Sequence, residues 1–214
     1  IKRVGYEKQS INGVVIVFKL EDHYPAKIGD KLANRHGNKG VVTYIEKSEN
    51  MPRTPWGESL DIIYNPLSII NRMNPGQIYE MYIGMIAKFA AKQLVEWGPK
   101  KTQKAIEYLS KIYKGIDNTK GQKYSSDIKK YLTGMSENQY VEFVKDIQAR
   151  NYFLPIIVPQ FQTPTRDQIK RVMNMVGIKN SYKLYLPEYK NTTLRNVAVG
   201  YMYFNKLEQQ ADIK

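Results

Sequence analysis

The sequence contains no cysteine and has two histidines, His23 and His36. Without cysteine the chain cannot form disulfides, thiolate zinc sites or a cysteine nucleophile, and two histidines do not make a histidine-rich metal site. It also lacks an apolar run of about 18 residues, so it predicts no transmembrane helix. No apolar stretch typical of a signal peptide follows Ile1. We therefore expect a cytoplasmic protein with no membrane partner.

Acidic residues are scarce relative to basic ones. The 214 residues include 33 Lys and Arg against 20 Asp and Glu, a net charge of +13. Such an excess favours a polyanionic partner, with nucleic acid the first candidate. A solvated lysine-rich surface, or a subunit that binds an acidic partner chain, would explain the same charge. The 42% of hydrophobic residues suffice for a packed core in one domain or two small ones.

Short β-branched runs between turn residues make residues 1–74 rich in strand patterns. They lie at 14–18, 40–45 and 60–64. Strand character returns after residue 151, and the runs there predict strands at 152–158, 183–186 and 194–204.

Helix signals begin at Asn74. Asn74 is expected to cap a helix over 75–97, with Pro75 at its first position and Gln77 completing a capping box. An apolar stripe at helical spacing indicates core packing, and Gly98 ends the helix. Further helices are expected at 102–113, 125–132, 136–150 and 165–176, the last two opened by the capping boxes Ser136/Gln139 and Thr165/Gln168, and the last ended by Gly177.

The order of these patterns is β, then helical, then β. We predict an α+β fold in which a helical insertion interrupts one β unit, because this explains the order more simply than two independent domains.

The segment 29–40, GDKLANRHGNKG, lies between two expected strands and carries the densest chemical signal. Its glycines and asparagines permit tight turns, and Lys31, Arg35 and Lys39 supply cations that can hold an anion. It is not a Walker A loop, because no Ser or Thr follows a Gly-Lys pair and no helix opens there. The anion could be a nucleotide, an RNA phosphate or an acidic protein patch. A glycine-rich hairpin with solvated charges would explain the same residues without any bound anion.

This segment closely resembles a signature of the second-largest (β) subunit of multisubunit DNA-dependent RNA polymerases. The resemblance continues in the family's order through Met51-Pro52, LDIIYNPL at 60–67, NRMNPGQI at 71–78 and VGYMY at 199–203 followed by Lys206-Leu207. The stretch 98–135 matches poorly. Several uncommon strings in one order identify the chain as similar to the C-terminal hybrid-binding region of β.

The resemblance implies a fold, an activity and partners. The fold is a double-psi β-barrel formed by residues 1–74 and 152–207, with a helical insertion at 75–151 and the truncated start of a clamp-proximal segment at 208–214. The activity is that of a nucleotidyltransferase that works only within a multisubunit complex. Its partners would be the largest (β′-type) subunit, which would hold catalytic Mg²⁺, the remaining portion of β, template DNA, the RNA transcript and nucleoside triphosphates.

The resemblance also implies residue roles. Lys31 and Lys39 would face the RNA 3′ end and nucleotide phosphates as catalytic residues, Arg72 would face the incoming triphosphate, and Arg35 would add charge for phosphate. No metal ligand is expected in this chain, since Asp30 and Asp61 are lone acids in the motif region. The residues expected to shape the loop, rather than to move protons, are Gly29, Asp30, Arg35, His36, Gly37, Asn38 and Gly40.

The chain departs from the family pattern where Gln209 replaces a histidine near the nucleotide site, so that contact is expected to be altered. Its divergent middle and its many Lys, Ile, Tyr and Asn residues favour a large bacteriophage that encodes its own polymerase. Two other functions stay open: a stand-alone basic module that binds single-stranded RNA through phosphate contacts and tyrosine stacking, and a purely structural assembly subunit.

Overall fold

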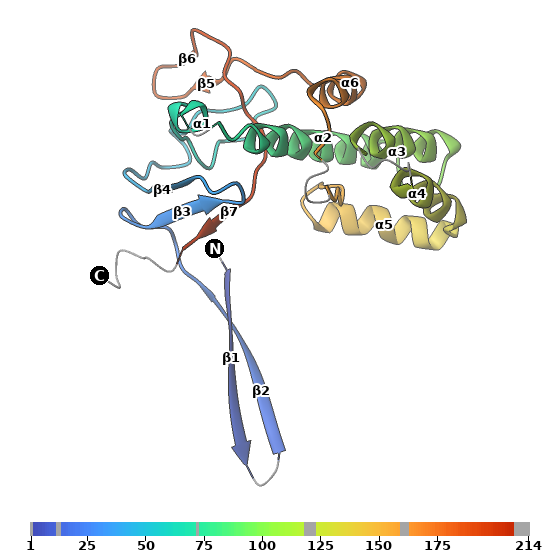
Figure 1. The fold of residues 1–214 in the computed structure, drawn as a ribbon, viewed down its shortest axis with the longest axis horizontal. Coiled ribbons are helices and arrows are strands. Elements are labelled where there is room, and N and C mark those ends of the chain that lie inside the picture. Colours follow the sequence, from blue (N-terminus) through green and yellow to red (C-terminus); the bar gives the residue numbers. More distant parts are fainter. Residues whose placement is uncertain (1, 12–13, 72, 118–122, 159–162, 208–214) are drawn as a thin grey trace. The chain divides into compact units, whose positions relative to one another are not determined.

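The computed structural model describes residues 2–11, 14–71, 73–117, 123–158 and 163–207 (Figure 1). The chain divides into two compact units, one made of Ile1–Ser48 with Tyr203–Lys214 and the other of Glu49–Met202. Helices and small sheets occur together, which confirms the expected α+β class.

The first unit contains two sheets. Strands β1 (Lys2–Ile11) and β2 (Val14–His23) form an antiparallel hairpin whose register runs from Lys2 opposite His23 to Ile11 opposite Val14. A second sheet has the order β4-β3-β7, with every pair antiparallel. Its strands are β3 (Lys31–Asn34), β4 (Lys39–Val41) and β7 (Phe204–Lys206).

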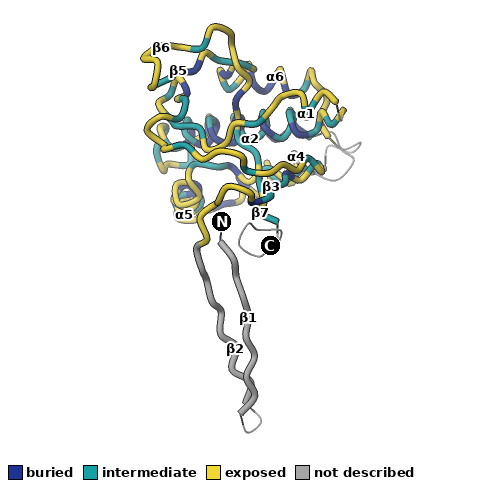
Figure 2. The backbone as a smooth tube through the Cα atoms, turned by 90° about the vertical axis from the view of Figure 1, so that its left-hand side faces the viewer, coloured by how far each residue is buried: buried dark blue, intermediate teal, exposed yellow. Residues whose placement is uncertain are grey.

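The second unit is mainly helical. Its longest helix, α2 (Gly76–Glu96), has buried residues on all sides, and Figure 2 shows buried positions along it. A helix that is apolar all round belongs in a core. The other elements of this unit are α1 (Leu67–Ile70), α3 (Gln103–Ile116), α4 (Lys123–Gly134), α5 (Glu137–Ala149), α6 (Arg166–Val176) and the hairpin of β5 (Tyr185–Leu186) with β6 (Asn191–Thr192). Helices α5 and α6 both contact α2.

The five longer helices lie where the sequence predicts them, and local chemistry explains their ends. Two of the three predicted capping boxes are present, at Ser136 with Gln139 and at Thr165 with Gln168. Gly177 ends α6 in the left-handed conformation with φ of 81°, which glycine adopts without a side-chain clash. The start of α2 differs, because Pro75 rather than Asn74 is the N-cap residue and it makes no side-chain cap.

The strand predictions were less accurate. Residues 60–64 form no strand: the Leu60 amide donates to the Pro52 carbonyl at 3.0 Å, and Ile62 and Ile63 are exposed. The expected strand at 40–45 ends at Val41, and of the stretch 194–204 only Phe204 belongs to a strand.

Residues 152–158 are also not a strand, because their backbone bonds to helices. Asn151 and Tyr152 have φ of 56° and 61°. The Tyr152 amide donates to Ile147 at the end of α5, and the Leu154 amide donates to Ala87 in α2. The expected barrel of residues 1–74 and 152–207 with its insertion at 75–151 stays a prediction.

The segment 199–201 crosses α2 at two glycines. A Cβ atom on Gly84 would lie 2.2 Å from the Tyr201 carbonyl oxygen, and one on Gly200 would lie 2.5 Å from the Met81 carbonyl oxygen. Two backbones can approach this closely only where neither carries a side chain.

A buried lysine joins this crossing to neighbouring segments. The Lys88 ammonium donates to the Asn151 carbonyl at 2.7 Å and lies 4.9 Å from the centre of the Phe153 ring. Its charge is balanced by Glu58, 4.0 Å away, which also accepts hydrogen bonds from Lys92 and from the Tyr201 hydroxyl. Partial burial raises the pKa of Glu58, but these hydrogen bonds and the two lysine charges outweigh burial and lower it.

Gly84→Ala should destabilise the chain, although alanine normally favours a helix by about 1 kcal/mol over glycine. The new methyl group would meet backbone atoms of Tyr201, and overpacking of this kind costs about 1–3 kcal/mol. Thermal unfolding of the purified chain, followed by circular dichroism, measures the change. Gly134→Ala in α4 is the matched control, since nothing lies within 4 Å of its Cβ position. Equal melting temperatures for the two variants would contradict the close crossing.

Candidate phosphate-binding face

The chemically dense segment 29–40 forms β3, β4 and the turn between them. In the register, Lys31 lies opposite Val41 and Ala33 opposite Lys39. On the other edge of β3, Ala33 lies opposite Asn205 and Leu32 opposite Lys206. The central strand of this sheet therefore carries Lys31 and is flanked by β4 and β7, which are far apart in the sequence.

The turn between β3 and β4 is organised by Asn34. Its Oδ1 atom accepts hydrogen bonds from the amides of His36 at 2.9 Å and Asn38 at 3.1 Å. The Asn34 amide in turn donates to the Asn38 carbonyl, and Gly37 has φ of 78°. The asparagines of the segment predict a turn without distinguishing Asn34, although the position of Asn34 before a glycine-containing turn suits an Asx motif. The backbone at Gly40 does not require glycine, because its φ is not positive and no atom lies within 4 Å of its Cβ position.

Asp30 lies inside the unit rather than on the loop surface. Its carboxylate accepts from the Lys27 amide at 2.8 Å and pairs with the Lys206 ammonium at 2.7 Å. The side chains of Asp30 and Lys206 are 1% and 6% exposed. Gly29, with φ of 94°, donates from its amide to the Val42 carbonyl and so places Asp30 at the start of β3. A buried charge of either sign requires such a partner.

The sheet has one buried and one open face, because side chains alternate along a strand and cross-strand partners share a face. The more buried face has the buried Asn34, the half-buried Leu32 and Phe204, and Lys206, whose side chain pairs with Asp30; we call it the buried face. The opposite face has Lys31, Ala33, Lys39, Val41 and Asn205. We call this second set the open face, since Lys39, Val41 and Asn205 are exposed and Lys31 and Ala33 are half-buried.

Lys31 and Lys39 are diagonal neighbours on the open face. Diagonal partners in an antiparallel pair are about 7–8 Å apart at the backbone, so two lysine side chains can reach one anion between them. Arg35 lies just beyond β3, with its guanidinium carbon 5.6 Å from the centre of the Tyr203 ring. His36 is half-buried in the turn.

Two other sequence-based positions, Arg72 and Gln209, lie outside the described residues, as does the whole segment 208–214. His23 lies in β2, opposite Lys2.

Carboxylates do not gather in the described part of the chain. No group of three or more His, Asp or Glu residues there could hold a metal ion. Asp30 is paired with Lys206, and Asp61 is exposed.

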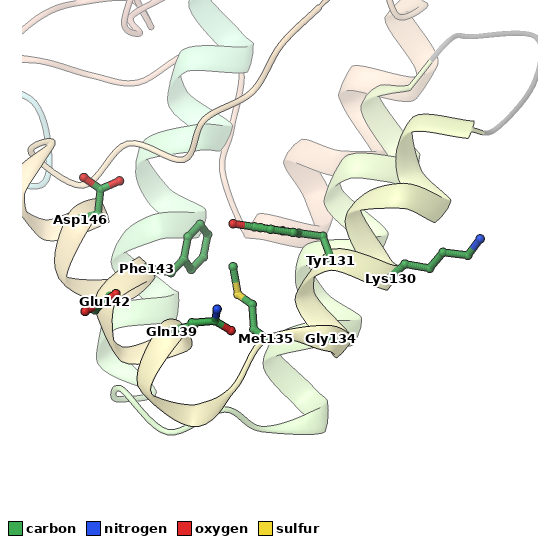
Figure 3. A pocket seen from close by; sticks show the side chains of 8 residues that line it. All are labelled: Lys130, Tyr131, Gly134, Met135, Gln139, Glu142, Phe143 and Asp146. Atoms are coloured by element: carbon green, nitrogen blue, oxygen red, sulfur yellow. The ribbon is translucent and has the colours of Figure 1, made fainter.

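A hollow of about 530 Å³ opens between α4 and α5 (Figure 3). Its walls combine Tyr131, Met135 and Phe143 with Lys130 and the carboxylates of Glu142 and Asp146. Two carboxylates against one ammonium give this lining a net negative charge, which is less suited to phosphate than the open face with its two lysines. Within the described ranges, no helix is long and apolar enough to cross a membrane.

Comparisons with known proteins agree with the loop motif. The family model described as RNA polymerase Rpb2, domain 6, matches residues 1–214. The DNA-directed RNA polymerase subunit beta of Aquifex aeolicus (strain VF5) is 35% identical over 216 residues, which cover 94% of this chain and 14% of that protein. The corresponding subunit of Anaplasma marginale (strain Florida) is 33% identical over 217 residues, covering 98% of this chain and 15% of that protein.

The chain thus spans a small part of the length of these relatives, and the similarity extends over nearly all of its own residues. The match includes both segments that build the open face, 29–41 and 204–206. The chain belongs to the RNA polymerase Rpb2, domain 6, family, and is a region of a β-type RNA polymerase subunit.

Proposed function

We propose that this chain is part of the catalytic β-type subunit of a DNA-directed RNA polymerase and that its open face binds phosphates at the reacting end of the RNA. The observation that carries the proposal is the shared face of Lys31 and Lys39. A third lysine of the same sheet, Lys206, is neutralised by Asp30 on the buried face. Lys31 and Lys39 lie on the other side of the sheet, which a ligand can reach.

The chemistry of nucleotidyl transfer suits such a surface. A 3′-hydroxyl attacks an α-phosphate in line while pyrophosphate leaves, so positioning and charge neutralisation supply most of the catalysis. Lysine acts as a point charge that tolerates phosphates moving through each cycle, whereas arginine forms a planar fork suited to a triphosphate. In this proposal Lys31 and Lys39 hold the RNA 3′ end and the initiating nucleotide, Arg35 adds charge beside them, and Arg72 contacts the incoming triphosphate.

The proposal requires other chains. By the family resemblance, catalytic Mg²⁺ would be held by the largest subunit, where it would stabilise the attacking and leaving oxygens. The remaining portion of β, template DNA, the RNA transcript and nucleoside triphosphates complete the proposed assembly. The three-stranded sheet would be one part of the double-psi β-barrel that the family resemblance implies.

A stand-alone RNA-binding module is less favoured. Such a module needs exposed aromatic rings on which bases stack. Tyr113 and Tyr140 are buried, and further tyrosines pack against the core, namely Tyr79, Tyr82, Tyr108, Tyr152, Tyr182 and Tyr201. These eight tyrosines thus serve packing, and the stacking that such a module needs would fall to exposed ones such as Tyr44 and Tyr189.

Lys31→Ala and Lys39→Ala should impair formation of the first phosphodiester bond more than extension of an existing hybrid. During initiation few contacts hold the nucleotide, whereas a long hybrid is also held by base pairs and many backbone contacts, so each ammonium supplies a larger share of the positioning. The free-energy loss in the double variant should be smaller than the sum of the two single losses, because both lysines would hold the same phosphate. Lys→Arg should rescue only partly, since a planar fork replaces a point charge.

The measurement compares dinucleotide synthesis with extension on a preassembled scaffold in the assembled polymerase. Lys170→Ala, which removes an exposed charge from α6, controls for the general loss of one positive charge. Equal losses in both assays would assign the two lysines to general hybrid binding instead of to the reactive end.

Arg72→Ala should raise the nucleotide concentration needed for half-maximal elongation. Loss of one charge-assisted contact costs about 1.5–3 kcal/mol, which corresponds to roughly tenfold to hundredfold in concentration. Elongation rates measured over a range of nucleotide concentrations give this value, with Arg195→Ala, an exposed arginine of the second unit, as the matched control. An unchanged half-saturating concentration would remove Arg72 from the nucleotide site.

A further inference from the structure

Asn205 lies on the same face as the two proposed phosphate-binding lysines, although it comes from the other end of the chain. It is opposite Ala33 in the pairing of β3 with β7, while Lys39 is opposite Ala33 in the pairing of β3 with β4. Cross-strand partners have Cβ atoms about 4.5–5.5 Å apart. Lys39, Ala33 and Asn205 therefore form one row across the sheet, with the exposed Asn205 at the β7 end.

The middle of this row has the smallest side chain. Ala33 contributes one methyl group, whereas Lys39 and Asn205 on either side, and Lys31 two residues earlier on β3, have longer side chains. Neighbouring strands are about 4.8 Å apart, and residues two apart on a strand are separated by about 6.8 Å. All three polar side chains are thus within reach of one phosphate group above Ala33.

The neighbours of Asn205 in β7 fix its direction. Phe204 and Lys206 belong to the buried face, and the Lys206 ammonium is held by Asp30 at 2.7 Å. The Leu207 amide donates to the Lys31 carbonyl at 2.9 Å, which extends the pairing past Lys206. Since side chains alternate along a strand, these contacts turn Asn205 toward the open face.

We propose that Asn205 is a further nucleotide-binding residue, whose side-chain amide donates a hydrogen bond to the phosphate held by Lys31 and Lys39 above Ala33. This inference rests on the proposed function of the two lysines. The ligand class is the phosphate of an RNA 3′ end or of an initiating nucleotide. An amide adds no net charge, so Asn205 contributes direction to a site in which the lysines contribute attraction.

The test replaces Asn205 with side chains of opposite charge in the assembled polymerase. Asn205→Asp should raise the half-saturating concentration of the initiating nucleotide in dinucleotide synthesis by about tenfold, and Asn205→Lys should lower it, because a charge within about 7 Å acts directly on the phosphate. The maximal rate should change little in either variant, as expected for a contact made equally in the ground and transition states. Both effects should shrink as ionic strength rises.

Matched controls are Asn191→Asp and Asn191→Lys, which make the same changes at an exposed strand position in the second unit. Ala33→Val tests the site without a change of charge: its added methyl groups should also raise the half-saturating concentration. Repeating the assay as extension on a preassembled scaffold separates the two sources of phosphate. An effect confined to dinucleotide synthesis assigns the site to the initiating nucleotide, and an effect in both assays assigns it to the RNA 3′ end as well.

Losses of similar size for Asn205→Asp and Asn205→Lys would overturn the proposal, because they would indicate only a structural role. The Asn205 proposal would also be overturned if the half-saturating concentration stayed unchanged in all variants of Asn205 and Ala33 while Lys31→Ala and Lys39→Ala were still impaired. The proposed function would then still stand. If Lys31→Ala and Lys39→Ala also left dinucleotide synthesis unchanged, both the Asn205 proposal and the proposed function would be overturned.

Discussion

The ion pair of Asp30 with Lys206 is the interaction on which the geometry of the open face depends. Each charge would be costly to bury alone, and the 2.7 Å contact offsets that cost only if β7 lies beside β3. Once this register is set, alternation along the strands decides the rest. Lys206 turns inward, and Lys31, Lys39 and Asn205 turn outward. A single buried contact thus holds Lys206 on the buried face, while Lys31 and Lys39 lie on the open face.

The helices were predictable because their signals are local. At Thr165 the hydroxyl and the Gln168 side chain satisfy amides within one turn, and at Gly177 the positive φ ends the helix without reference to the rest of the fold. The start of α2 shows the limit of this reasoning. Pro75 is the N-cap although Asn74 has the better capping side chain, since a cap preference of about 1 kcal/mol can be outweighed by packing.

Strands and the full site could not be predicted in the same way, because a strand needs a partner that periodicity does not name. The run at 60–64 has strand-forming residues but no strand beside it, and the backbone of 152–158 bonds to α5 and α2. Local composition located the turn at 29–40 and its cations. The pairing of Asp30 with Lys206, and the place of Asn205 beside Ala33, depend on register between distant segments and become visible only in three dimensions.

The first unit takes its strands from both ends of the chain, and this has a consequence for biosynthesis. At ribosomal rates of about 5–20 residues per second, roughly ten to thirty seconds separate the emergence of β3 from that of β7. During this interval one edge of β3 has unpaired amides and carbonyls, the template for unwanted strand association. Meanwhile the whole second unit emerges and can fold. The nascent chain therefore passes through a period of aggregation risk that lasts until β7 has been synthesised and pairs with β3.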